Sequence, residues 1–282
     1  MLLTRSTTKV QFVDLGAGAV AAMSLRDLSQ PAAYSMRRTG PDAASADGNI
    51  RDFASTVGFV RSSLVLPRRW PHLARVVTVR GSELVDDPSG GLNPRVLPAD
   101  KPGFEHSCDG LITTNFGVVL GAQGADCPML YLHDPVAHVI GAIHCGWKPV
   151  AQHIVRNAIN GFAALGSDVS DIRAYVAPGA GDSVYKFAID GGSQPLLEQT
   201  GRLDEFQDML RPHPTEAGQQ VFPLNAMVVR DLEAAGLGAH QITNDTRSCI
   251  EDESLHSYRR DGGPDMATSR HGLGIGVIFL TA

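Results

Sequence analysis

The sequence predicts a single domain of mixed α and β structure, and three observations lead to this fold class. Short apolar runs of strand length occur along much of the chain, and three of them follow one another closely between residues 117 and 144. Residues 150–165 and 223–235 instead place apolar side chains at helical spacing. Neither an internal repeat nor a long polar linker divides the sequence, so we expect one domain over residues 1–282.

The first third of the chain is expected to contain more strand than helix. Strands are predicted at three places: residues 9–15, 19–25 and 73–79. A short helix is predicted over residues 49–58, after a loop at 38–48 that is rich in Gly, Pro, Asp and Ala. Residues 81–101 have a similar composition and predict a long surface loop, a kind of segment that often carries function.

The rest of the chain predicts a hairpin and then alternating helices and strands. The hairpin joins strands at 129–133 and 138–144 through a turn at Asp134-Pro135. Pro149 suits the first turn of the helix at 150–165, and Gly166 suits its end. A second helix over 223–235 ends before Gly236. The remaining strands are expected at residues 117–123, 172–177, 240–243 and 273–281.

Composition excludes several classes of protein. Hydrophobic residues make up 43% and charged residues 19% of the chain, which is ordinary for a folded domain and excludes wholesale disorder. A net charge of −6 argues against a nucleic-acid partner bound through its phosphates. The longest apolar run, LGIGVIFLTA, is about half the length of a membrane span. Without a charged apolar leader we expect a cytoplasmic protein with no membrane partner and with four free thiols.

Cys127 and His144 are the first candidates for chemistry. The predicted hairpin lies between them, and antiparallel pairing would bring both residues to the same end of the sheet. A thiolate beside an imidazole suits either a nucleophilic cysteine with its base or two ligands of a zinc ion. Spacing alone leaves a third alternative open, a buried cysteine near a core histidine. His133 and His138 lie at the other end of the hairpin, where we expect both to face solvent.

The segment CDGLITTNFGVVLGAQGADCPMLYLHDPVAHVIGAIHCGWK resembles the central block of the YfiH or laccase-domain family. The family pattern is a D-x-[LI]-x-T segment, a D-C-x-P segment, a D-P turn and an H-x-G-W-[RK] segment. The matching residues are Asp109, Asp126, Cys127, Pro128, Asp134, Pro135, His144, Gly146, Trp147 and Lys148. SYRRDG at 257–262 resembles a second family block, and a weaker likeness covers residues 172–181. Together the resemblance spans roughly residues 73–280.

This resemblance implies a fold and an activity. Family members are regarded as purine nucleoside phosphorylases with accessory nucleoside deaminase activity, so a pentosyltransferase acting on a nucleoside and phosphate is implied. The implied fold is a four-layer α-β-β-α sandwich with the site at the end of a sheet. Family members carry a metal, usually taken as zinc, on one cysteine and two histidines. By position, Cys127 and His144 match two of these ligands.

The third family ligand is missing from its expected place. The family has the histidine of Q-V-H-G where this chain has Arg80, and arginine has no lone pair to offer a metal. A guanidinium about 5 Å from a divalent cation would cost roughly 6–7 kcal/mol at an effective dielectric constant of about 20. Arg80 would instead stabilise the Cys127 thiolate and attract an anion. His106 and Cys108 are nearby residues that offer a replacement ligand.

The expected site therefore has a catalytic part and a substrate-binding part. We expect Cys127, His144, Arg80 and Asp126 to act in catalysis. Substrate binding is assigned to Arg259, Arg260, Arg270, Trp147 and Asp109. The arginines would form an anion-binding wall, or alternatively a solvated loop salt-bridged to Asp261. Trp147 would stack on a base, or alternatively pack in the core.

Three functions remain open at this point. The first is the phosphorylase, which converts adenosine, inosine or methylthioadenosine to the free base and ribose 1-phosphate. The second is a metal-free hydrolase or cyclase with Cys127 as nucleophile and His144 as base. The third is a non-catalytic protein that binds a small anion in the same pocket.

Overall fold

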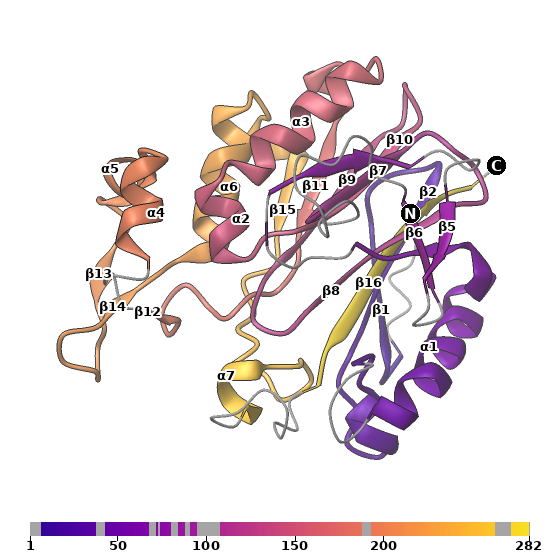
Figure 1. The fold of residues 1–282 in the computed structure, drawn as a ribbon, viewed down its shortest axis with the longest axis horizontal. Helices are drawn as coiled ribbons and strands as arrows, with labels where there is room; N and C mark the ends of the chain where they lie inside the picture. Colours follow the sequence, from indigo (N-terminus) through magenta and orange to yellow (C-terminus); the bar gives the residue numbers. More distant parts are fainter. Residues whose placement is uncertain are drawn as a thin grey trace.

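The computed structural model describes residues 7–37, 43–67, 72, 74–79, 84–87, 91–94, 108–187, 193–262 and 272–281. Two mixed β-sheets pack face to face, and helices cover both outer faces (Figure 1). Helices α3 (Ile154–Ala164) and α6 (Leu224–Ala234) lie on one side, and α1 (Ala43–Val57) lies on the other. This arrangement confirms the predicted mixed α/β class and the four-layer sandwich.

The first sheet runs in the order β1 (Val10–Val13), β2 (Ala19–Ser24), β16 (Gly274–Leu280), β8 (Val119–Gly124), β3 (Leu64–Val65), β6 (Gly91–Pro94) and β5 (Leu84–Asp87). The second runs β15 (Ile242–Asn244), β11 (Arg173–Val176), β9 (Met129–Asp134), β10 (Val139–His144), β7 (Gly110–Thr113) and β4 (Val76–Thr78). Most neighbours are antiparallel, while β3 with β8, β3 with β6, β4 with β7 and β11 with β15 are parallel. The predicted hairpin is confirmed as β9 and β10.

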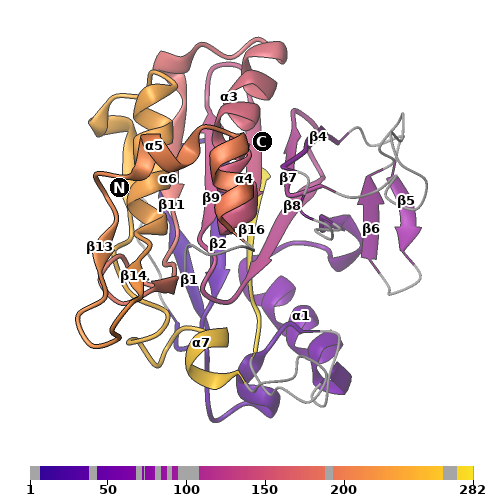
Figure 2. The ribbon, with the colours of Figure 1, turned by 60° about the vertical axis from the view of Figure 1, so that its left-hand side comes forward.

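A small third sheet stands apart from the two large ones. Its order is β12 (Lys186–Phe187), β14 (Gln220–Val221) and β13 (Arg211–Pro212). With α4 (Gln194–Gln199) and α5 (Arg202–Phe206) it lies beside α2 (Trp147–Ala151) and α6, on the side of the molecule away from α1 (Figures 1 and 2). The last helix, α7 (Tyr258–Asp261), lies near the ends of the sheets. Turns of 3-10 helix occur at Pro31–Tyr34, Arg61–Ser63, Val169–Asp171 and Ala239–Gln241.

Three apolar clusters hold the four layers together, and the alternation of side chains along each strand creates them. In β2, Ala21 and Met23 enter the cluster between the sheets, while Ala22 faces α1. In β10, Ile143 packs under α3 on the helix-covered face, while Ala142 points between the sheets. Period-two patterning in these strands thus supplies both neighbouring layers of the core.

The helices differ from the sequence prediction in two places. Helix α1 starts at Ala43, within the segment predicted as a loop, because the alanines at 43, 44 and 46 are strong helix formers. The single helix predicted over 150–165 is two helices, α2 and α3, separated at Gln152 and His153. His153 has a φ of 61°, a left-handed conformation that an α-helix cannot contain.

Several strands also differ from the prediction. β7 was not predicted, and β4 is shorter than the predicted strand at 73–79. The predicted loop at 81–101 contains β5 and β6. The expectation that His133 faces solvent was wrong, although His138 is exposed. His133 points between the sheets, where its Nδ1 donates to the Leu15 carbonyl oxygen at 3.0 Å, so the β1–β2 connection covers it.

Replacing Gly48 by alanine is expected to stabilise the protein. Gly48 lies inside α1, has no left-handed φ, and a Cβ built there would meet nothing within 4 Å. Alanine should therefore add about 0.5–1 kcal/mol to the free energy of unfolding, or about 1–4 °C to the melting temperature. Thermal unfolding followed by circular dichroism measures the change. A lower melting temperature would show that the helix propensity of residue 48 does not limit the stability of α1.

Candidate active site

The β9–β10 hairpin brings Cys127 and His144 together. Met129 pairs with His144, and the Cys145 N–H donates to the Pro128 carbonyl oxygen at 2.9 Å, so the Cys127 turn lies against the end of β10. A Cβ built on Gly146 would lie 3.2 Å from His144 Nε2 and 3.3 Å from Cys127 Sγ. The imidazole and the thiol therefore face the same small space beside Gly146, which only glycine leaves open.

Asp109 joins His144 to a second histidine, His72, which the sequence analysis did not select. Asp109 Oδ1 lies 3.2 Å from His144 Nδ1 and 2.8 Å from His72 Nδ1, while Oδ2 accepts from the Ala74 N–H at 3.1 Å. The carboxyl group is fully buried at the start of β7. Asp109 was expected to bind substrate, but here it contacts two imidazoles. His72 precedes β4 without any motif around it, so no sequence signal marked it.

Burial and the two neighbouring histidines shift the pKa of the Asp109 carboxyl in opposite directions. Burial alone would raise the pKa of this carboxyl, but the hydrogen bonds from His144 and His72 outweigh it and hold the pKa below its usual value. Asp109 is therefore ionised at neutral pH and can only accept hydrogen bonds. Both histidines consequently donate from Nδ1, and Nε2 is the acceptor atom of each neutral ring.

Asp126 connects Cys127 to the SYRRDG segment. Its Oδ2 accepts from the Arg259 N–H at 2.7 Å, and its carbonyl oxygen accepts from the Ala180 N–H at 2.7 Å. Asp126 has a φ of 75°, a conformation that is uncommon for residues other than glycine. Burial raises the pKa of its carboxyl, opposed by hydrogen bonds from Ser257 and Arg259. The turn before Cys127 is thus fixed to the first turn of α7.

Arg259 and Tyr185 form a wall next to Cys127. The Arg259 guanidinium lies 5.0 Å from the centroid of the Tyr185 ring. Burial raises the pKa of Tyr185 to about 12, and the charge of the nearby Cys127 thiolate acts in the same direction while Arg259 opposes both. One arginine, one phenol and one thiol therefore lie close together. No motif marked Tyr185, which directly precedes β12, because only the tertiary fold brings it to this site.

The other described residues that were expected to bind substrate are less exposed to solvent than Arg259. Arg260 uses its guanidinium inside the protein, donating to Asp261 and to the carbonyl oxygens of Cys249, Asp252 and Leu255. This geometry favours the alternative considered above, a salt bridge to Asp261. Trp147 is partly exposed and packs edge-on against Phe187, with ring centroids 5.2 Å apart. Arg80, Arg270 and His106 lie outside the described residues.

A small cavity of about 20 Å³ lies behind Cys127. Asp126, His256 and Cys249 are among the residues that line it. Asp126 Oδ1 and His256 Nε2 are buried polar atoms without a hydrogen-bond partner. The cavity is large enough for one water molecule, which could bind both atoms.

His256 should make the protein less stable in acid. Burial, helped by the charge of Arg26, lowers the pKa of the His256 imidazole to about 4, against a value of 6.5 in the unfolded chain. Between pH 6.5 and pH 4 the unfolded state binds the proton more readily. The free energy of unfolding therefore decreases as the pH is lowered through this range, by a total of about 3 kcal/mol. Melting temperatures at pH 7 and pH 5 should differ less in His256→Gln than in the wild type and in His240→Gln, an exposed control. Equal differences in all three proteins would contradict this assignment.

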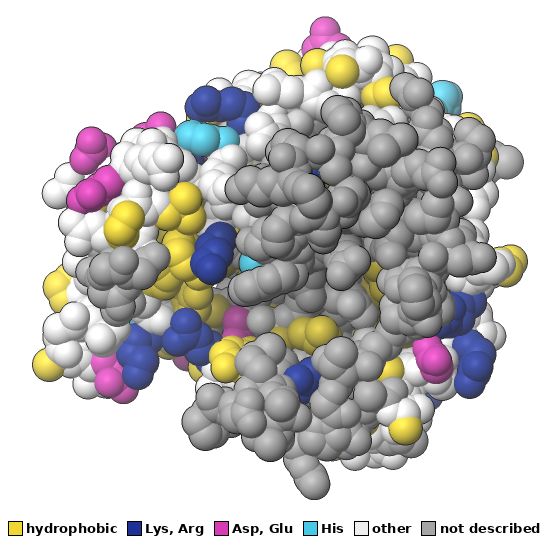
Figure 3. Space-filling view, viewed as in Figure 1, with side chains coloured by type: hydrophobic (Ala, Val, Ile, Leu, Met, Phe, Trp, Pro, Cys, Tyr) yellow, Lys and Arg dark blue, Asp and Glu magenta, His cyan; other side chains and the backbone are white. Residues whose placement is uncertain are grey.

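On the outer surface, Lys and Arg side chains, a histidine and hydrophobic side chains gather near the centre of the face shown in Figure 3. This region lies between α2 and α7 in the view of Figure 1. The α-β-β-α sandwich places a thiol, two imidazoles and an arginine at the end of a sheet, a combination of side chains that is typical of active sites. Its ligands suit a metal ion, and its arginine suits a small anion.

Comparison with known proteins identifies the family. The chain belongs to the multi-copper polyphenol oxidoreductase laccase family, whose model matches residues 32–280. Its fold is similar to that of Bacillus licheniformis hypothetical protein YfiH, with a TM-score of 0.77 and 20% identity over 98% of each chain. This confirms the predicted family and the sandwich fold.

The curated relatives have names of a different kind from the family description. The chain is 32% identical over 177 residues to a purine nucleoside phosphorylase of Deinococcus radiodurans, covering 60% of this chain and 62% of that protein. It is 31% identical over 165 residues to purine nucleoside phosphorylase Cgl2154/cg2365 of Corynebacterium glutamicum, covering 58% of this chain and 62% of that protein. The matched part thus spans less than two thirds of these relatives.

One group of residues in the described part of the chain could bind a metal ion. The ligand atoms of His72, Asp109 and His144 all lie within 4.8 Å of one another. Cys127 is not a member of that group, although its sulfur and His144 Nε2 both border the space beside Gly146. The donor set therefore fits a metal through its histidines, and the ligand role of Cys127 stays a prediction. Among the described helices, none is long and apolar enough to cross a membrane.

Proposed function

We propose that this protein is a purine nucleoside phosphorylase that converts adenosine, inosine or methylthioadenosine to the free base and a ribose 1-phosphate. The names of the relatives support a pentosyltransferase of this kind. The observation that carries the proposal is the meeting of Cys127, His144 and Asp109 with the Arg259–Tyr185 wall at one end of the β9–β10 hairpin. The substrate is a small molecule, and we propose a cytoplasmic location.

The reaction exchanges one bond at the anomeric carbon. An oxygen of the phosphate monoanion attacks C1′ of the ribose while the bond from C1′ to the base nitrogen breaks, and the departing base takes the electron pair and the proton that the phosphate gives up. Arg259 would hold the phosphate, because a guanidinium binds phosphate oxygens through paired N–H groups. Asp126 would position Arg259 through its backbone N–H. Partly exposed Trp147 would stack on the base, and Arg80 and Arg270 would add positive charge.

A zinc ion would be held by Cys127 and His144 under this proposal. Such an ion supplies Lewis-acid polarisation of a bound oxygen. Asp109 would keep His144 in the tautomer whose Nε2 faces the Cys127 side, as carboxylates do behind many metal-binding histidines.

The test is incubation of the purified protein with adenosine, inosine or methylthioadenosine and phosphate, followed by chromatography of the released base. Release must depend on phosphate, and ribose 1-phosphate must form in equal amount. Base release without phosphate would indicate a hydrolase. No release from any of the three nucleosides would refute the proposal.

A second candidate function is supported by the order of three side chains. Cys127 lies on the Nε2 side of His144 and Asp109 on the Nδ1 side, an order shared with cysteine hydrolases. In this reading Cys127 is the nucleophile and His144 the base of a metal-free hydrolase or cyclase. Mass spectrometry after iodoacetamide at neutral pH would test it, since an activated Cys127 reacts before the buried Cys108, Cys145 and Cys249. Thermal stabilisation by phosphate or nucleosides without turnover would instead identify an anion-binding protein.

Replacing Arg259 by glutamine should weaken phosphate binding. Arg259 is the described arginine that contacts Tyr185 beside Cys127, so its loss should raise the KM for phosphate roughly 10- to 100-fold. The KM for nucleoside should change far less. Arg156→Gln, an exposed substitution on α3, is the matched control. An equal rise in both KM values would show that Arg259 shapes the pocket and does not bind phosphate.

A further inference from the structure

We propose that Asn225 is a positioning residue for Cys127. Its side-chain amide fixes the segment at residues 177–182, and that segment fixes the turn that carries Cys127. The inference deepens the proposed function and rests on it, because Cys127 belongs to the proposed active site. Asn225 lies at the start of α6 and is not among the residues assigned above to catalysis, to substrate binding or to a metal.

The segment is bonded to the Cys127 turn at two places. The Ala180 N–H donates to the Asp126 carbonyl oxygen at 2.7 Å. The Ala177 N–H donates to the Met129 carbonyl oxygen at 2.9 Å. One of these bonds comes before Cys127 in the sequence and the other after it. A shift of the segment would therefore move the turn as well, because a buried carbonyl oxygen that loses its donor is left unpaired at a cost in free energy.

The Asn225 amide is bonded where two parallel strands end. Its Nδ2 donates to the Ala177 carbonyl oxygen at 2.9 Å, directly after β11. The same atom donates to Asn244 Oδ1 at 3.3 Å, at the end of β15. Because both partners are acceptors, they determine which atom of the amide is the nitrogen. Asn225 is only 4% exposed, so water competes little for these bonds.

The other polar atom of the amide, Oδ1, lies against Gly179 in the middle of the segment. A Cβ built on Gly179 would lie 2.1 Å from Asn225 Oδ1 and 3.2 Å from Pro128 Cδ. The amide and the proline that follows Cys127 therefore both border this glycine, and a residue with a side chain would not fit there. Oδ1 is buried and has no hydrogen-bond partner among the described residues, so it acts through this close packing.

Asp182 joins the start of α6 to the same segment through the backbone. Its Oδ1 accepts from the Asn225 N–H at 3.1 Å, and its Oδ2 accepts from the Ala226 N–H at 3.2 Å. The carboxylate thus caps α6, whose N-cap residue, Pro223, makes no side-chain bond of this kind. The first turn of α6 consequently fixes the segment at its first residue through a side chain and at its last residue through the backbone.

Hydrogen–deuterium exchange measured by mass spectrometry tests this role without any substrate. In Asn225→Ala, the peptides that cover residues 177–182 and 125–131 should exchange roughly 10-fold faster than in the wild type. The reason is that the N–H groups of Ala177 and Ala180 lose the support of the amide, so their bonds to the Cys127 turn open more often.

Gln241→Ala is the matched control, because it removes another amide that binds a backbone carbonyl oxygen beside β11. Gln241 Nε2 donates to the Ile172 carbonyl oxygen at 2.7 Å, at the other end of that strand. Its loss should lower the melting temperature. Exchange in the two peptides should stay as it is in the wild type.

Steady-state kinetics distinguish positioning from a general effect on stability. Asn225→Ala should lower kcat for phosphorolysis roughly 10- to 100-fold, because a displaced Cys127 is a misplaced reacting group. The KM values for inosine and phosphate should change by at most about threefold, since the positioning role removes no contact with either substrate. Gln241→Ala should keep the wild-type kcat. Equal kcat values in Asn225→Ala and Gln241→Ala would overturn the inference.

Asn225→Ser keeps the result interpretable if alanine disturbs the fold. Serine has a shorter side chain and should lose the bond to Ala177, while its hydroxyl keeps the buried space polar. Wild-type exchange at residues 177–182 in folded Asn225→Ser would contradict the inference. A wild-type protein that releases no base, together with faster exchange in both Asn225 variants, would refute only the proposed function. An active phosphorylase whose exchange and kcat do not depend on Asn225 would refute only this inference.

Discussion

Replacing Cys127 by alanine is expected to lower kcat/KM for phosphorolysis by roughly 1,000-fold, a loss of about 4 kcal/mol of transition-state stabilisation. The sulfur shares one small space with His144 Nε2, so its removal takes away the thiolate on which both the metal-bound and the metal-free mechanisms depend. Stability should change little, because Cys127 is only partly buried. Steady-state kinetics with inosine and phosphate measure the effect.

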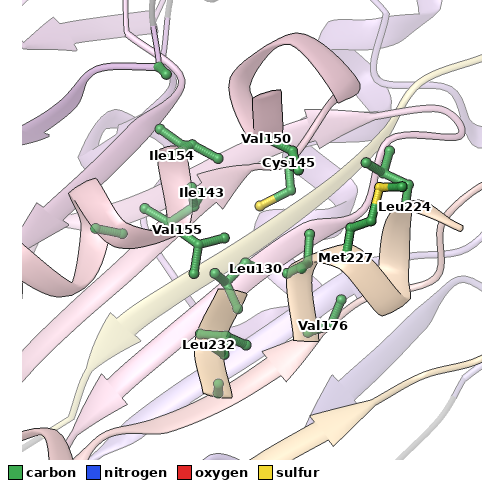
Figure 4. Close-up of a cluster of buried hydrophobic side chains, with 14 of the residues drawn as sticks. Leu130, Ile143, Cys145, Val150, Ile154, Val155, Val176, Leu224, Met227 and Leu232 are labelled. Carbon is green, nitrogen blue, oxygen red and sulfur yellow. The ribbon is translucent and has the colours of Figure 1, made fainter. Parts of the chain in front are cut away.

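Cys145→Ala is the matched control for this experiment. Cys145 follows His144 but points to the opposite side, into the cluster of Leu130, Val150 and Met227 (Figure 4). Its loss leaves a small cavity and should lower the free energy of unfolding by about 1–2 kcal/mol while kcat/KM changes less than twofold. Full activity in Cys127→Ala would remove Cys127 from the mechanism. Equal loss in both variants would indicate damage to the fold.

Replacing Gly146 by alanine is expected to lower kcat roughly 100-fold without removing any functional group. A Cβ at this position would lie 2.9 Å from His144 Cε1, 3.2 Å from Nε2 and 3.3 Å from Cys127 Sγ. Such contacts are too close, so the imidazole or the sulfur must move, and displacement of reacting groups by about 1 Å can cost 100-fold in rate. The kcat for phosphorolysis and the affinity for cobalt(II) should both decrease.

Gly48→Ala serves as the control, since it adds the same methyl group where nothing lies within 4 Å. It should keep wild-type kinetics and gain stability. Gly146→Ala should keep a melting temperature within a few degrees of the wild type, because the residue is the N-cap of α2 and lies outside the apolar clusters. Wild-type kcat in Gly146→Ala would show that the space between His144 and Cys127 is not used in catalysis.

The sequence by itself determined the strands with clear alternation and the hairpin that joins Cys127 to His144. Period-two and helical patterns are local, so they predicted β9, β10 and α6 to within a residue or two. The same local reasoning failed at His133. The β1–β2 connection covers that histidine through the Leu15 carbonyl oxygen, more than 100 residues away in the chain, and a window of local sequence cannot contain such a neighbour.

Only the tertiary structure decided how the site is completed. His72 meets His144 through Asp109, and Arg259 meets Tyr185, although each pair is separated by some 70 residues. These contacts depend on how the sheets order their strands and on where β12 and α7 come to lie. Spacing along the chain fixes which residues share a hairpin or a helix face. Which distant side chains share a cavity follows from the packing of whole layers, since that packing sets their distances in space.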